Sequence, residues 1–270
     1  MSGPQIHPTA IVAPGAELAE DVQVEPYAVI GPKVRIGSGT HVGTHAVISG
    51  RTTIGRENRI FHHASVGAVP QDLKYRGEDS ELVIGDHNQI REFTTLHVGT
   101  SGGGMVTRVG DHNLLMNYSH IAHDSRLGSY TVVANGAQLA GHVVVEDYVV
   151  VGALVGIHQF ARIGESAILG AGAMVSQDVP PFCNATGDRA RLHGLNLVGL
   201  KRRGFSPETV HDIKRAYRMV FHSGLKLAEA MVQARQELPA SAQVEKFLSF
   251  IAASERGVCR EQSKRIETNS

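Results

Sequence analysis

The chain has 270 residues, and its 26 basic and 26 acidic side chains leave it close to neutral. That balance does not favour a nucleic-acid-binding protein, which would carry a basic field, or an acidic solvating tail. No run of about 18 apolar residues is present, and the first ten residues lack the pattern of a signal peptide, so we expect no membrane span. Cys183 and Cys259 are expected to be reduced thiols of a cytoplasmic protein.

An aliphatic residue recurs every six positions from near the N-terminus to about residue 180. Neither an α-helix nor an ordinary alternating strand produces a sustained period of six. The recurring positions form three runs: Ile6, Val12, Leu18, Val24, Ile30, Ile36, Val42, Ile48, Ile54, Ile60 and Val66; then Ile84, Ile90 and Leu96; then Val109, Leu115, Ile121, Leu127, Val133, Leu139, Val145, Val151, Ile157, Ile163, Leu169 and Val175.

A small or β-branched residue usually stands two positions before the next aliphatic one, as Ala10, Val22 and Ala161 do. A short strand would therefore point both side chains inwards. The intervening positions must turn a corner, and Gly, Asn and Asp are common there. Three such hexads would close a triangular coil, and stacked coils would pair as parallel strands. The pattern resembles the left-handed parallel β-helix of hexapeptide-repeat proteins, which we expect over residues 1–190.

Two interruptions predict loops at 67–83 and 99–108. Val66 and Ile84 are 18 positions apart with no aliphatic residue at 72 or 78, which suggests that one coil's worth of chain leaves as a loop. Between Leu96 and Val109 the phase slips by one through TSGGGMVT, and we infer that this second loop adds seven residues. Loops on a rigid scaffold commonly carry function.

A small α-helical domain is expected over residues 191–270, because the period of six stops after Pro181. Ser206, Pro207 and Glu208 form a helix N-cap, a proline at the first helical position and an acidic first turn. They predict a helix from there to about His222. Two more helices are expected near 226–237 and 241–256. This domain would cap the last coil and block edge-to-edge association.

Histidines gather in the hexad pattern. Counting in steps of 18, with the second loop removed, aligns Ile60, Leu96, Ile121, Leu139 and Ile157 in one column. The corners that follow these positions carry six histidines: His62, His63, His97, His123, His142 and His158. His120 lies at the same edge. Such a file can be a set of surface side chains at tolerant corners, but its length favours a polar cleft along one edge, where neighbouring subunits could meet.

The histidines allow two kinds of chemistry. A metal site is one, since imidazole is a common zinc ligand. The expected spacing of coils argues against it, because His97 and His158 would then lie about 15 Å apart, and we expect no metal. General-base catalysis needs only one neutral imidazole beside an acidic partner, and His123 followed by Asp124 supplies that pair.

Eight segments carry a resemblance to a known family: QDLKY (71–75), GDHNQIRE (85–92), DHNLLM (111–116), HIAHD (120–124), LAGHV (139–143), IHQF (157–160), QDVPPF (177–182) and GLKRRGFS (199–206). They resemble the UDP-N-acetylglucosamine O-acyltransferases, over nearly the whole chain. The resemblance implies a homotrimer with active sites between adjacent β-helices. It implies transfer of a (3R)-3-hydroxyacyl group from acyl carrier protein to the glucosamine 3-position of UDP-N-acetylglucosamine, the first step of lipid A biosynthesis.

The same resemblance implies roles for individual residues. His123 would be the general base, Asp124 its orienting partner and Gly141 the backbone donor to the oxyanion, with no covalent acyl-enzyme. Ala171 would stand at the position that limits acyl-chain length. The resemblance implies no cofactor, because the donor's acyl group is carried on the phosphopantetheine of acyl carrier protein. The substrate-contacting positions would be Gln71, Asp72, Lys74, His97, His120, His142, His158, Gln159, Asn196, Arg202 and Arg203.

Two positions depart from the family pattern, and they leave the acceptor open between a 3-hydroxyl and a 3-amino sugar. Val98 stands where an arginine is usual, and Val198 where an acidic residue is expected. Alternative functions are the N-acyltransferase of the same pathway, which carries an additional N-terminal domain, and coenzyme A acetyltransferases, which lack QDLKY and GLKRRGF together. A non-catalytic scaffold would need neither HIAHD nor the two loops.

Overall fold

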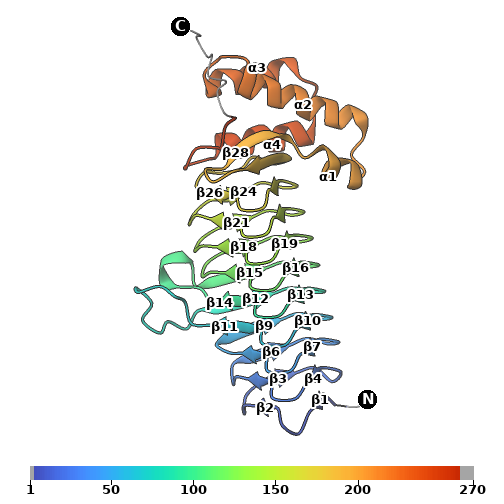
Figure 1. The fold of residues 1–270 in the computed structure, drawn as a ribbon, viewed down its shortest axis with the longest axis vertical. Helices are drawn as coiled ribbons and strands as arrows, with labels where there is room; N and C mark the ends of the chain where they lie inside the picture. The colour runs from blue at the N-terminus through green and yellow to red at the C-terminus, as the bar shows by residue number, and fades with distance from the viewer. Residues whose placement is uncertain (1–2, 262–270) are drawn as a thin grey trace.

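The computed structural model describes residues 3–261. It is a tall stack of triangular coils with helices at its C-terminal end (Figure 1). Each coil contributes one short strand to each of three sheets, here called A, B and C, and the strands that stack within a sheet are parallel. The chain is thus the left-handed parallel β-helix that the period of six predicts.

Sheet A holds eleven strands, and only its last pair, β27 and β28, is antiparallel. In stacking order the strands are β1 (Gln5–Ile6), β4 (Gln23–Val24), β7 (His41–Val42), β10 (Arg59–Ile60), β13 (Gln89–Ile90), β16 (Leu114–Leu115), β19 (Val132–Val133), β22 (Val150–Val151), β25 (Ile168–Leu169), β27 (Cys183–Thr186) and β28 (Arg191–Leu195).

Sheet B holds nine strands: β2 (Ile11–Val12), β5 (Val29–Ile30), β8 (Val47–Ile48), β11 (Ser65–Ala68), β14 (Thr95–His97), β17 (His120–Ile121), β20 (Gln138–Leu139), β23 (Gly156–Ile157) and β26 (Met174–Val175). Sheet C holds eight: β3 (Glu17–Leu18), β6 (Val34–Ile36), β9 (Arg51–Ile54), β12 (Glu81–Ile84), β15 (Val106–Val109), β18 (Arg126–Leu127), β21 (Val144–Val145) and β24 (Arg162–Ile163).

The core is a column of aliphatic side chains inside the triangle. Both inward positions of a hexad are buried, as Val143 and Val145 are at 0 % and 2 % exposure. The residue between them points outwards, because successive side chains of a strand alternate. At many corners the third residue has a left-handed backbone, with φ of 59° at Asp124 and 62° at His142. This conformation is uncommon outside glycine, and it turns the chain sharply into the next sheet.

The sequence predicted that Ile60 stacks in one column with Leu96 and the positions that follow it. This alignment is wrong for the coils on the N-terminal side of the first loop. Ile84 pairs with Ile54, 30 positions earlier, and Leu96 pairs with Val66. The first loop therefore adds twelve residues and not a whole coil. Ile60 lies in sheet A, so His62 and His63 stand at the corner between sheets A and B. The second loop adds seven residues as predicted, since Leu96 pairs with Ile121 across 25 positions; it contains a short 3-10 helix, Ser101–Gly103.

Helix α2 (Pro207–His222) confirms the predicted helix, with the Ser206 side chain accepting from the amide of Thr209. Helix α3 (Leu227–Glu237) also agrees with the prediction, whereas α4 (Ala242–Ala252) ends four residues before the expected Arg256. Helix α1 (Leu197–Arg202) and strand β28 were not anticipated. The domain division at residue 190 stays a prediction, and residues 262–270 lie outside the described part of the chain.

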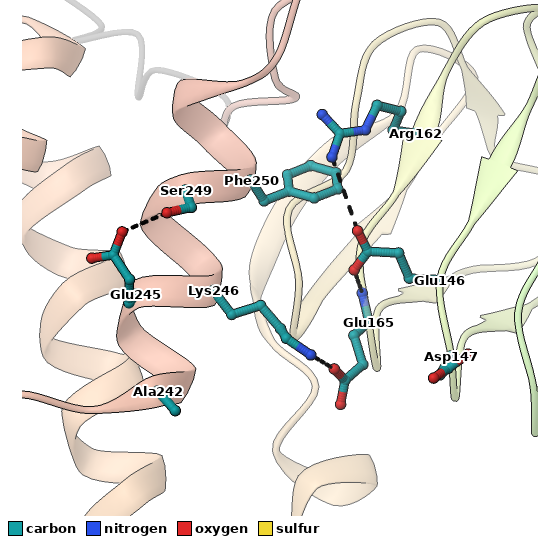
Figure 2. A pocket seen from close by; sticks show the side chains of 9 residues that line it. All are labelled: Glu146, Asp147, Arg162, Glu165, Ala242, Glu245, Lys246, Ser249 and Phe250. Atoms are coloured by element: carbon teal, nitrogen blue, oxygen red, sulfur yellow. Dashed lines mark hydrogen bonds and ion pairs between the residues drawn. The ribbon is translucent and has the colours of Figure 1, made fainter.

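Helix α4 packs against the last coils. Three of its own side chains, Phe247, Leu248 and Ile251, are buried. Beside this contact is a cavity of about 650 Å³, in which Lys246 of α4 reaches Glu165 of the β-helix (Figure 2). Within residues 3–261, no helix has the length and apolar character needed to cross a membrane.

Candidate active site

His123 and Asp124 form a hydrogen-bonded pair at the corner between sheets B and C, here called the B–C edge. The Nδ1 of His123 lies 2.8 Å from Oδ2 of Asp124, whose side chain is fully buried. On a flat strand two consecutive side chains would point apart. Here the left-handed backbone of Asp124 brings its carboxylate beside the preceding imidazole. The sequence-predicted pair is thus in contact.

The second loop holds Asp124 in place. The amide of Thr100 donates to Oδ1 at 2.9 Å, and the hydroxyl of Thr100 donates to Oδ2 at 2.7 Å. Gly103 packs so closely on the carboxylate that a Cβ there would lie 2.0 Å from Asp124 Cγ. An ionised carboxylate can only accept hydrogen bonds. The donor in the bond between Asp124 and His123 is therefore an N–H at Nδ1 of His123. This leaves Nε2 of a neutral His123 with a free lone pair.

Gly141 lies directly under the imidazole of His123. A Cβ at Gly141 would be 2.7 Å from His123 Nε2, so a side chain there would push the ring away. Within residues 3–261, the Gly141 amide N–H donates to no acceptor. A free N–H beside the base can receive the negative oxygen of a tetrahedral intermediate.

Three further histidines surround the pair. His142 stacks on Phe160, meets His123 edge-on at 5.1 Å between centroids, and has its Nε2 3.9 Å from Asp124 Oδ2. His120 accepts from or donates to the hydroxyl of Thr95 at 2.7 Å, and its ring lies 4.8 Å from that of His97. Burial lowers the pKa of all three, that of His97 to about 4, so they are neutral at pH 7.

His97 is buried, and its Nδ1 has no hydrogen-bond partner among the described residues. Val98, one of the two departures from the family pattern, is also buried, and its Cγ1 would lie 3.1 Å from a Cβ on Gly50. It presents no polar group to the B–C edge. The edge therefore carries neutral imidazoles near the His123–Asp124 pair and no cation at position 98.

His158 stands one coil further along the same edge and has a partner that sequence reasoning missed. Arg256 Nη2 lies 3.2 Å from His158 Nδ1, and the same guanidinium donates to the carbonyl of Ser176 at 3.1 Å. Arg256 follows helix α4, 98 residues after His158. No local sequence signal could link the two. Gln159, beside His158, is exposed.

The first loop brings its residues to the same edge. Gln71 and Lys74 are exposed, and Asp72 is half-buried. The carboxylate of Asp72 accepts from the amide of Lys74 at 2.9 Å. It also lies near enough to His142 to act on the pKa of that imidazole, in the direction opposite to burial.

Ala171 is exposed at the corner between sheets A and B. The last three predicted residues lie at the corner between sheets C and A, the C–A edge, or beside it. Asn196 caps helix α1 and donates to the carbonyl of Ser166 at 2.9 Å. Arg203 binds Glu165 at 2.6 Å and sits 3.6 Å over the ring of Tyr148. Arg202 is exposed. Within one chain, the structure does not bring these residues together with the histidines.

Comparisons with known proteins agree with one another. Residues 178–259 match a family profile described as domain 2 of UDP-N-acetylglucosamine O-acyltransferase, and residues 15–50 match the bacterial transferase hexapeptide profile. The acyl-[acyl-carrier-protein]–UDP-N-acetylglucosamine O-acyltransferase of Myxococcus xanthus is 55 % identical over 95 % of this chain and 99 % of its own.

Solved structures give the same result. A UDP-N-acetylglucosamine acyltransferase from Bacteroides fragilis superposes with a TM-score of 0.93 at 39 % identity, covering 95 % of this chain and all of the other. That from Francisella novicida gives 0.92 at 40 % identity, covering 96 % and 95 %. The chain belongs to the UDP-N-acetylglucosamine O-acyltransferase family. The fold and family inferred from the sequence are confirmed, and the roles of individual residues stay predictions.

The B–C edge holds a group of side chains that could ligate a metal ion. His123, Asp124 and His142 each offer a ligand atom, and these atoms lie within 4.8 Å of one another. The expectation that the histidines are too spread to converge is therefore wrong for His123 and His142. However, Asp124 already accepts two bonds from Thr100 and one from His123. An ion bound by Asp124 would have to compete with these bonds.

We expect strong chelators to leave turnover unchanged, because the Asp124 oxygens serve as hydrogen-bond acceptors. The measurement is the initial rate after dialysis against EDTA and against phenanthroline, compared with a mock-dialysed sample. Loss of activity that returns on addition of zinc would establish a metal role for the His123, Asp124 and His142 group.

Proposed function

We propose that this chain transfers a (3R)-3-hydroxyacyl group from acyl carrier protein to the glucosamine 3-position of UDP-N-acetylglucosamine, the first step of lipid A biosynthesis, in the cytoplasm. The observation that carries the proposal is the His123–Asp124 pair in a member of this family. The Nδ1 of His123 lies 2.8 Å from Oδ2 of Asp124, and the imidazole stands over Gly141. No cofactor is proposed beyond the phosphopantetheine that carries the donor.

His123 acts as a general base. Its Nδ1–H is held by Asp124, so Nε2 accepts the proton of the sugar 3-hydroxyl as that oxygen attacks the thioester carbonyl. The carbonyl oxygen becomes an oxyanion, which the Gly141 amide stabilises. The C–S bond then breaks, and the thiol leaves with the proton that His123 took. Asp124 keeps the tautomer fixed and stabilises the imidazolium, and no acyl-enzyme forms.

The positions of the other residues support a homotrimer. Asp72 and Lys74, which the family resemblance assigns to the sugar, lie at or near the B–C edge together with other expected substrate contacts, namely Gln71, His97, His120, His142 and His158. Of the four residues that the resemblance assigns to the nucleotide end, Gln159 also lies at the B–C edge, whereas Asn196, Arg202 and Arg203 lie at the C–A edge or beside it. A planar guanidinium suits a diphosphate. If both sets bind one substrate, the B–C edge of one copy must face the C–A edge of the next.

The proposed reaction is tested with the purified chain, UDP-N-acetylglucosamine and a panel of 3-hydroxyacyl carrier proteins. We expect a 3-O-acyl product, identified by mass spectrometry and NMR. The departures at Val98 and Val198 leave the acceptor open between a 3-hydroxyl and a 3-amino sugar. A matched reaction with the 3-amino sugar nucleotide compares the rates with the two acceptors. Transfer from acetyl-coenzyme A alone, or no transfer from any hydroxyacyl carrier protein, would contradict the proposal.

A further inference from the structure

The guanidinium of Arg203 is held by three neighbouring side chains at the C–A edge. Arg203 ends helix α1, and its amide donates to the carbonyl of Gly199 at 3.0 Å. Its Nη1 donates to Oε1 of Glu165 at 2.6 Å and to the hydroxyl of Ser166. Its Cζ lies 3.6 Å from the centre of the Tyr148 ring. Together these contacts fix both the position and the rotation of the guanidinium.

Tyr148 belongs to a stack of rings that runs along the C–A edge from coil to coil. The rings are, in order, His87, His112, Tyr130 and Tyr148, with 4.7 to 4.9 Å between the centroids of neighbours. Arg203 lies on the last ring of this stack, and the face of a tyrosine attracts a cation. The surface that supports the guanidinium is therefore part of the repeating scaffold.

Glu165 is itself held in place. Its side chain is only 10 % exposed, and Oε2 accepts from Lys246 of helix α4. Its amide donates to the carboxylate of Glu146 at 2.9 Å (Figure 2). Burial raises the pKa of Glu165, but the hydrogen bonds from Lys246 and Arg203 outweigh it and lower the pKa below its usual value. Glu165 therefore presents a fixed negative oxygen to Arg203 at pH 7.

The contacts of Arg203 leave one side of its guanidinium unused. A guanidinium has five N–H donors, and the two on Nη1 serve Glu165 and Ser166. Within residues 3–261, Nε and Nη2 donate to no acceptor. Their N–H groups point to the same side, so they can donate in parallel to two oxygens of one phosphate. The side chain is 24 % exposed, so it is not sealed from solvent.

We propose that Glu165 is a positioning residue for Arg203, which occupies Nη1 and thereby keeps Nε and Nη2 aligned for the diphosphate of the sugar nucleotide. This inference rests on the proposed function, in which Arg203 contacts the nucleotide end of the substrate. Binding by a flexible arginine would have to order that side chain, which weakens affinity. Here Glu165 orders the guanidinium before the substrate arrives.

Glu165→Ala should raise the Kd for UDP-N-acetylglucosamine about tenfold, because the arginine is then ordered only on binding. The KM for this substrate should rise by a similar factor. The kcat at saturation should stay within about twofold of wild type, because the contact of His123 with Asp124 does not involve Glu165. The measurements are calorimetric titration with UDP-N-acetylglucosamine and initial rates with a 3-hydroxyacyl carrier protein.

A double-mutant cycle separates positioning of Arg203 from anchoring of helix α4 through Lys246. Arg203→Ala alone should weaken binding, and adding Glu165→Ala to it should cause no further loss. The same cycle with Glu165→Gln, which keeps the side-chain volume, covers the case in which alanine disturbs the packing. Glu245→Gln is the matched control, because Glu245 borders the same cavity but pairs with Arg235. It should leave the Kd unchanged.

Melting temperature and oligomeric state are recorded for every variant. An unchanged Kd in Glu165→Ala or in Arg203→Ala would overturn the positioning role. So would a loss of the same size with and without Arg203, because Glu165 would then act on something other than that guanidinium. Failure of the wild-type chain to bind UDP-N-acetylglucosamine at all would instead refute the proposed function, so the two failures are distinguishable.

Discussion

Replacing His123 with alanine is expected to lower turnover about 10²–10⁴-fold and to leave the fold unchanged. In the proposed mechanism, the free Nε2 of this imidazole receives the proton of the attacking hydroxyl. The side chain is on a corner, 15 % exposed and outside the aliphatic column, so its removal creates no large core cavity. The neighbouring imidazoles of His120 and His142 cannot substitute for it, because Asp124 directs its hydrogen bond to His123.

The measurement is kcat with UDP-N-acetylglucosamine and a 3-hydroxyacyl carrier protein, alongside the melting temperature and the oligomeric state. His62→Ala is the matched control, since His62 is a corner histidine at the edge between sheets A and B, away from Asp124. It should keep near-wild-type kcat. A His123→Ala enzyme within a few-fold of wild type would refute the general-base assignment.

The β-helix could be predicted from the sequence because its rule is local and repeated. Each hexad buries two side chains, as Val22 and Val24 do, and this sets a period that no other regular structure shares. Helix α2 was equally predictable, because Ser206, Pro207 and Glu208 mark its start. Both inferences needed only neighbouring residues, and both agree with the structure.

The register between coils was not predictable from the period of six. A loop that adds 12 residues and one that adds 18 both return the chain in phase, so the spacing of Val66 and Ile84 fits either. The pairing of Ile84 with Ile54 shows that the loop adds 12 residues. This pairing is a long-range contact, which the period of six does not reveal. The error moved His62 and His63 to the wrong edge, but it left His97, His123 and His142 together, because they all follow the first loop.

The parts of the site that depend on remote contacts were also missed. Arg256 reaches His158 from beyond helix α4, and Thr100 reaches Asp124 across a loop. Asp124 itself was found, but its contact with His123 depends on a left-handed backbone that the sequence permits without requiring. Helix α1 was missed because Lys201 and the following arginines are equally typical of a solvated turn.

Asp124→Asn is expected to lower kcat about 10²–10⁴-fold through the tautomer of His123. The Thr100 amide donates to Oδ1, so the asparagine oxygen should take that position. The NH₂ group then takes the place of Oδ2 and donates to Nδ1 of His123. A neutral imidazole that accepts at Nδ1 carries its hydrogen at Nε2, and it can no longer act as a base there.

Asparagine is the informative replacement because it keeps the volume of the carboxylate and, like aspartate, tolerates the left-handed backbone observed at φ 59°. The melting temperature should therefore change little, and Asp147→Asn at the C–A edge serves as the control for a carboxylate-to-amide change at a corner. Raising the pH should not restore the rate, because the defect is the position of a hydrogen and not a titration. A kcat within fivefold of wild type, or recovery at high pH, would show that Asp124 does not set the tautomer of His123.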